Sequence, residues 1–112
     1  MTNTIQLPQD ISVIETSSAK VVLDAVNVFL KHNQEKMDVL ERVDLTPVSM
    51  WDTLRLSGNV ATRVCRVRLA LSDILPSNHT VFDCMRELSV RTMKLERKVR
   101  SFSKSLDRSV LC

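Results

Sequence analysis

Between residues 81 and 106, apolar side chains recur alternately every four and three positions, and no other feature of the chain constrains its fold as strongly. This spacing, kept over the length that a coiled coil requires, is typical of a long helix in a coiled coil or a helical bundle. It predicts a helix over about residues 79–108, with Thr80-x-x-Asp83 as a capping box at its start. The row consists of Val81, Met85, Leu88, Thr92, Leu95, Val99, Phe102 and Leu106.

Residues 17–43 have a second helical pattern. Hydroxyl side chains at positions 16–18 suit a helix N-cap, and the apolar residues behind them form two adjacent rows. Together the rows are wider than the seam of a dimeric coiled coil, so this helix needs two neighbours. Asn33 falls in one of these rows. It is either a buried amide that fixes the register or, if the helix is slightly rotated, a solvent-exposed residue.

The sequence pattern predicts a third helix over residues 47–75. It begins at Thr46-Pro47, because proline suits the first helical position, and Ser49-x-x-Asp52 is a second possible start. It ends before Pro76, which disfavours helix in the residue preceding it. Gly58 inside a helix costs about 1 kcal/mol relative to alanine. Two interpretations remain open: the helix breaks at residues 57–59, or Gly58, Ala61 and Cys65 form a strip of small side chains that another helix approaches closely.

The fold class follows from these segments and from the near absence of turn residues. One glycine and three prolines in 112 residues cannot supply the turns of a β-sandwich or a glycine-rich phosphate loop. We therefore predict an all-α fold: three long helices in an antiparallel, up-down-up bundle, with the C-terminal helix extending as coiled coil. Residues 16–112 would form one helical domain. Residues 1–15 would be a flexible tail, or alternatively a short extended segment that packs on the bundle or on a partner.

The sequence offers little for catalysis. His32 and His79 lie on different segments, with no carboxylate or nucleophile at a useful local spacing. Cys65, Cys84 and Cys112 form no C-x-x-C pair, which argues against a disulfide framework or a zinc site. We interpret Cys65 and Cys84 as small buried hydrophobes. We expect no enzymatic activity, no catalytic residue, no cofactor, no metal and no small-molecule substrate.

No apolar stretch is long enough to cross a bilayer, and residues 1–10 do not resemble a secretory signal. The expected location is therefore the cytoplasm, with the nucleus as the alternative, and the chain is not expected to be secreted.

Charge is distributed unevenly along the chain. Residues 1–45 carry four basic and seven acidic residues, whereas residues 46–112 carry twelve basic and six acidic residues, for a net charge of +3 overall. A basic half can attract an acidic partner, nucleic acid or an anionic membrane, but an acidic half in the same bundle can also neutralise it.

The preferred function is a non-catalytic helical or coiled-coil subunit, or adaptor, of a hetero-oligomeric intracellular complex of the cytoskeletal, kinetochore or organelle-trafficking type. A homodimer is the alternative assembly. Arg91 and Lys98 flank the apolar row, where their charge would select the partner. Phe82, Val90 and Met93 lie off the row and give the helix a second, patchier apolar side. The expected partner-binding residues are Met85, Leu88, Arg91, Leu95, Lys98, Val99, Phe102 and Leu106.

The alternative function is a basic helical module that binds nucleic acid or an anionic membrane through Arg63, Arg66 and the third helix. The basic residues of that helix spread around it instead of gathering on one side, and the chain has no tyrosine to stack on bases. We therefore rank nucleic acid below a helical partner.

Overall fold

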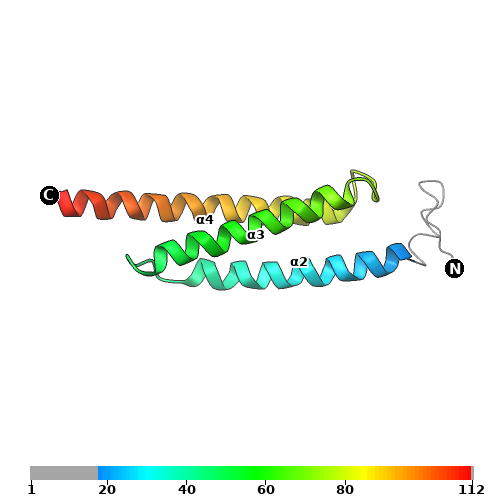
Figure 1. Cartoon of the computed structure of the whole chain (residues 1–112), viewed down its shortest axis with the longest axis horizontal. Helices are drawn as coiled ribbons and strands as arrows, with labels where there is room; N and C mark the ends of the chain where they lie inside the picture. Colours follow the sequence, from blue (N-terminus) through cyan, green and yellow to red (C-terminus); the bar gives the residue numbers. More distant parts are fainter. Residues whose placement is uncertain (1–17, 112) are drawn as a thin grey trace. The chain divides into compact units, whose positions relative to one another are not determined.

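The computed structural model describes the backbone of residues 18–111 and the side chains of residues 20–108. Three helices make up most of this range: α2 (Ser18–Arg42), α3 (Ser49–Leu71) and α4 (Thr80–Leu111) (Figure 1). The described residues contain no strand, which confirms the all-α class and the three long helices. The up-down-up order and the coiled-coil extension stay predictions. The tail expected over residues 1–15 lies outside the described residues.

The chain divides into two compact units, residues 1–32 and residues 33–112, and the division falls within α2. In the described part of the first unit, Val26 and Leu30 are the buried residues. The second unit holds the last turns of α2 together with all of α3 and α4, and it contains the surfaces discussed below. The single domain expected over residues 16–112 stays a prediction.

Helices α3 and α4 pack against each other and run in opposite directions (Figure 1). Their packing buries the row of apolar residues on α4 that the sequence pattern predicts. Each fully buried side chain of this size contributes about 1.5–3 kcal/mol to stability. The buried residues are Met50, Thr53, Ser57, Val60, Val64 and Leu71 of α3, and Val81, Met85, Leu88, Thr92, Leu95 and Val99 of α4. In the second unit α2 adds Asn33, Met37 and Leu40.

Two polar side chains inside this core, Thr92 and Ser57, form hydrogen bonds with nearby backbone. The Thr92 hydroxyl donates to the Ser89 carbonyl at 2.7 Å, and the Ser57 hydroxyl donates to the Thr92 carbonyl at 3.4 Å. A hydroxyl that bonds to its own helix can replace an apolar residue without leaving a buried donor unsatisfied. Asn33 is only 1% exposed, which decides between its two interpretations in favour of a buried amide.

Helix α3 starts as the Thr46-Pro47 pattern indicates, although regular helix begins at Ser49. The Ser49 N–H donates to the Thr46 hydroxyl oxygen, and the Thr46 N–H donates to the Ser49 hydroxyl oxygen, both at 2.9 Å. The Ser49 hydroxyl also donates to the Asp44 carbonyl at 2.8 Å. This reciprocal pair satisfies two backbone donors that would otherwise lack partners at a helix start.

The other end of α3 differs from the prediction. Regular helix stops at Leu71 instead of Leu75, since the Ile74 N–H bonds to the Leu71 carbonyl in a tighter turn. The Ser72 hydroxyl also donates back to the Leu69 carbonyl at 2.7 Å. The effect of Pro76 thus extends over the whole preceding turn rather than one residue.

Helix α4 begins at Thr80, but its cap comes from His79. The His79 Nδ1 atom accepts the Val81 N–H at 3.2 Å, in place of the Thr80 and Asp83 capping box that the sequence predicts. Asp83 instead pairs with Arg86 at 3.4 Å. The helix continues to Leu111, beyond the predicted end at residue 108.

Helix α3 does not break at Gly58. The helix is continuous from Ser49 to Leu71, and Gly58 has a negative φ. A Cβ added at Gly58 would meet no atom within 4 Å. The chain's own packing therefore does not require a glycine here.

Candidate functional site

Four of the expected partner-binding residues of α4 are buried in the chain's own core. Met85, Leu88, Leu95 and Val99 are at most 4% exposed and pack in the core of the second unit. A partner can reach these four side chains only if α3 moves away. They therefore act first as the chain's own core, and their role in partner binding stays a prediction.

Arg91 lies against acidic residues of the same chain. Its Nη2 donates to Asp38 Oδ1 at 2.7 Å and to Glu41 Oε1 at 2.6 Å, and its Nε donates to Glu41 Oε2 at 2.9 Å. The fork of the guanidinium thus holds the Glu41 carboxylate with two parallel bonds, the strongest geometry for such a pair. Helix α2 therefore supplies the acidic partner that the sequence pattern assigned to another protein.

This contact changes the titration of both groups. Hydrogen bonding from Arg91 holds the pKa of Glu41 below its ordinary value of 4.5, although burial acts in the opposite direction. The same bond raises the pKa of Arg91 above its ordinary value. The charge of Lys98 adds a smaller pull that also lowers the pKa of Glu41. Of the two residues expected to select a partner, Arg91 therefore pairs with carboxylates of α2, whereas Lys98 forms no ion pair with a described residue.

The last turns of α4 extend past the loop that joins α2 to α3 (Figure 1). Phe102 and Leu106, the final members of the apolar row, lie in these turns and are half-buried. The apolar row is therefore fully buried only as far as Val99. We call residues 101–108, whose first turn still borders Trp51 and Leu54 of α3, the projecting end of α4.

A second surface lies between α3 and α4. Arg91 and Met93 stand one residue on either side of buried Thr92, so at 100° per residue they mark opposite edges of the row. On the Met93 edge, three hollows of about 440, 250 and 170 Å³ follow one another along the helix pair. We call this the α3–α4 groove. It is lined from α3 and the turn after it by Trp51, Leu54, Ser57, Gly58, Ala61, Arg68, Ser72 and Ser77, and from α4 by Phe82, Arg86, Ser89, Thr92, Met93, Glu96, Val99, Arg100, Ser103 and Lys104.

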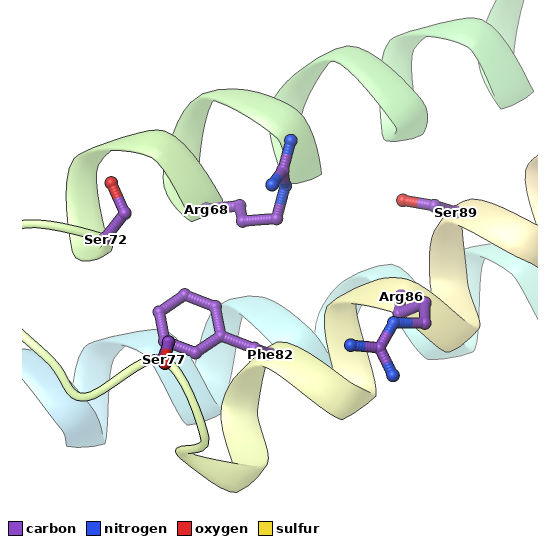
Figure 2. A pocket seen from close by; sticks show the side chains of 6 residues that line it. All are labelled: Arg68, Ser72, Ser77, Phe82, Arg86 and Ser89. Atoms are coloured by element: carbon purple, nitrogen blue, oxygen red, sulfur yellow. The ribbon is translucent and has the colours of Figure 1, made fainter.

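The largest hollow lies where α3 ends and α4 begins. Figure 2 shows the Phe82 ring between the two helices, with Arg68 from α3 and Ser89 from α4 projecting into the space between them. Arg86 lines the same hollow from α4. The hollow therefore combines an aromatic wall with two guanidinium groups.

Sequence reasoning did not find this groove as one surface, although parts of its signal were visible. Residues 51, 54, 58 and 61 repeat at helical spacing on α3, and Gly58 with Ala61 stood out as small residues. Phe82 and Met93 stood out as apolar residues beside the main row of α4. Nothing local indicated that these two stripes face the same side of the helix pair.

The remaining chemistry-bearing residues are dispersed. Among residues 18–111, no three His, Cys, Asp or Glu side chains come together as a group that could hold a metal ion. Cys65 is exposed and Cys84 is half-buried, so the interpretation of both as buried hydrophobes was wrong. The reason is that their positions flank the buried rows of α3 and α4 instead of belonging to them. None of the described helices combines the length and apolarity needed to span a bilayer.

Arg63 and Arg66, the α3 residues of the alternative function, are both exposed. Neither forms an ion pair with a residue that the structure describes. No family model, curated protein or solved structure matches the chain.

Proposed function

We propose that the chain is a non-catalytic helical subunit or adaptor of a hetero-oligomeric intracellular complex, and that it binds a partner helix through the projecting end of α4. The observation that carries this proposal is that full burial of the apolar row ends before the row does. The row is fully buried as far as Val99, whereas Phe102 and Leu106 continue it and stay partly exposed.

A helix is the partner that suits these turns. Side chains at spacings of four and three form a straight stripe only along a helix, and another helix buries such a stripe along its length. Burial of Phe102 and Leu106 would contribute about 1.5–3 kcal/mol for each side chain that is fully covered. Subunits of this kind occur in cytoskeletal, kinetochore and organelle-trafficking complexes, and the choice among these rests on fold analogy alone.

The test compares two double variants with the wild type. Phe102→Glu with Leu106→Glu places two charges in the stripe, while Ser101→Glu with Ser105→Glu adds the same charge on exposed positions of the same turns. Each tagged protein is recovered from cells and its co-purifying proteins are quantified by mass spectrometry. We expect a stoichiometric partner with the wild type and the serine variant, and its loss with the Phe102 and Leu106 variant.

Circular dichroism of the purified variants should show wild-type helicity, because Phe102 and Leu106 lie beyond the covered core. Equal recovery of the partner by all three proteins would contradict the proposal. Binding to a DNA duplex or to anionic vesicles that weakens steeply with salt, and that is lost in Arg63→Glu with Arg66→Glu, would favour the alternative function instead.

A further inference from the structure

We propose that the α3–α4 groove is a docking site for one amphipathic partner helix that is apolar at its centre and acidic at both ends. This inference rests on the proposed function in that it too makes the chain a partner-binding subunit, but it concerns a different surface. The groove lies on the Met93 side of α4, whereas the proposed function concerns Phe102 and Leu106 of the apolar row; the two surfaces adjoin at residues 100–104.

The groove has the dimensions of a single helix. Its lining runs along α3 from Trp51 to Arg68, with no lining residue between Ala61 and Arg68, and along α4 from Phe82 to Lys104. At about 1.5 Å per residue this corresponds to roughly 30 Å, the length of a helix of about 20 residues. A helix lying between two antiparallel helices packs its side chains into the space between their ridges.

The central part of the groove is mainly apolar. Leu54, Gly58 and Ala61 line it from α3 and Met93 lines it from α4, with Ser57, Thr92 and Glu96 as its polar lining. Met93 is 50% exposed and Trp51, at one end, is 56% exposed. Large apolar side chains with this much exposure in one groove are typical of an interaction surface.

Gly58 indicates how closely the occupant approaches. A mid-helix glycine costs about 1 kcal/mol relative to alanine, and nothing in the chain's own packing requires it. Its missing side chain leaves open space in the wall of the groove. A helix whose backbone lies close to α3 would need that space.

Charge defines the ends of the occupant. Arg68 and Arg86 line the hollow at one end, and Arg100 and Lys104 line the hollow at the other end (Figure 2 shows the first). Arg68 forms no ion pair with a described residue, and Arg86 has only its exposed neighbour Asp83. Carboxylates at both ends of the occupant would therefore meet guanidinium and ammonium groups.

The same charges disfavour a second copy of this chain. In a symmetric pair that joins groove to groove, each basic end faces either the equivalent end or the opposite end of the other copy. Both ends are basic, so either arrangement places like charges together, which costs free energy in an interface. Glu96, the one acid of the groove, already pairs with Arg100 at 2.9 Å.

The test uses the full chain and two synthetic peptides of about 20 residues. Both peptides carry leucine and alanine at the positions that face the groove. One has two glutamates at each end, and the other has lysines in their place. We expect the glutamate peptide to bind about tenfold more tightly at low salt, and this ratio to shrink as salt screens the charges. In NMR spectra the largest shifts should fall on Gly58, Ala61 and Met93.

Two variants of Gly58 distinguish weaker binding caused by filling the groove from weaker binding caused by unfolding. Gly58→Leu should weaken binding of the glutamate peptide at least tenfold, because its side chain occupies the path of the peptide backbone. Gly58→Ala should change binding less than threefold. Both variants should be at least as stable as the wild type, since the position is open and both residues favour helix more than glycine does. Arg68→Glu with Arg86→Glu should remove the preference for glutamate over lysine.

Several outcomes would overturn the inference: no binding of either peptide, equal binding by the Gly58→Leu variant, or shifts outside the groove. A dimer in light scattering that Gly58→Leu abolishes would replace the partner helix with a second copy. Binding to anionic vesicles through Arg68 and Arg86, without peptide binding, would replace it with a membrane surface. The outcomes for the two proposals can be told apart. If Phe102→Glu with Leu106→Glu loses the cellular partner but neither peptide binds the groove, this inference fails and the proposed function stands. If that variant keeps the cellular partner and the glutamate peptide binds the groove, only the proposed function is rejected.

Discussion

The two edges of the buried row on α4 each carry an arginine, but the two arginines have different surroundings. On one edge, Arg91 is held by Asp38 and Glu41 of α2 and its side chain is 23% exposed. On the other edge, Arg100 pairs only with Glu96 of its own helix and its side chain is 63% exposed. An arginine thus links α4 to α2 on one edge, whereas on the other edge an arginine lines an open groove.

The two edges differ in whether another helix lies against them. We call the Arg91 side, where α2 residues pair with Arg91, the covered edge, and the Met93 side, which borders the groove, the open edge. A cation that bonds two carboxylates from another helix restrains that helix, and partial burial strengthens the interaction because less water screens it. An exposed pair within one helix restrains nothing beyond a single turn and contributes a few tenths of a kcal/mol. Substitutions on the covered edge should therefore affect folding, and those on the open edge should affect binding.

The largest expected effect comes from the row between the two edges. Leu88→Asp should lower the free energy of unfolding by several kcal/mol and abolish cooperative folding, since it buries an unpaired charge at a position that is 1% exposed. Met93→Asp, on the open edge, should leave the fold intact. Urea denaturation followed by circular dichroism measures both. A stable Leu88→Asp variant with wild-type helicity would show that α3 does not cover this row.

The sequence alone could predict much of the covered core. The spacing that includes Leu88 and Leu95 depends only on helix periodicity, and both residues are buried as expected. The turn at Thr46 that leads into α3 also followed from local chemistry, because the Thr46 hydroxyl accepts the Ser49 N–H at the start of the helix. These two features, each set by residues close in sequence, were therefore predictable, whereas the His79 cap of α4 and the early end of α3 were not.

Features set by residues far apart in sequence were not predictable. Arg91 meets Glu41, fifty positions away, only because α2 lies on that edge of α4. The continuity of α3 through Gly58 depends on burial of Ser57 and Val60 beside it, and this packing outweighs the local cost of glycine. For the same reason, the sequence could not show which edge of α4 would be left open.

The second prediction reverses charge on the covered edge. Arg91→Glu should lower the free energy of unfolding by about 1–2 kcal/mol, since it replaces a bidentate pair with repulsion from Asp38 and Glu41. Adding Glu41→Arg should recover part of the loss, and a double-mutant cycle isolates this coupling. Arg100→Glu, on the open edge, is the matched control and should cost less than about 0.5 kcal/mol. If Arg91→Glu and Arg100→Glu lowered the free energy of unfolding equally, the two edges would not differ in their contribution to folding.

The third prediction uses pH to test the covered edge without reversing a charge. The pKa of Glu41 lies below 4.5 in the folded chain, so the unfolded chain takes up the proton first as pH falls. The contribution of this carboxylate to stability is therefore complete at neutral pH and declines once pH falls below about 4.5 and through the lowered pKa. The stability difference between the wild type and Glu41→Gln should be constant from about pH 6 to 8 and should disappear in acid. A difference that persists at pH 2–3 would assign the effect of the substitution to packing instead of charge.

The smallest expected effect comes from the ion pair on the open edge. Glu96→Gln removes an i,i+4 pair whose side chains are 46% and 63% exposed, so the free energy of unfolding should fall by only about 0.3 kcal/mol. Because solvent surrounds this pair, most of that loss should disappear at 1 M salt, whereas the loss from Glu41→Gln should persist in larger part. The same substitution removes the one acid that lines the groove, so it should strengthen binding of the glutamate peptide by up to about threefold, a gain of about 0.6 kcal/mol. Parallel denaturation and peptide titrations of the two glutamine variants measure both effects. A loss at Glu96 as large as that at Glu41, or equally resistant to salt, would mean that the open edge is covered in solution, and neither edge would then be free to bind a partner.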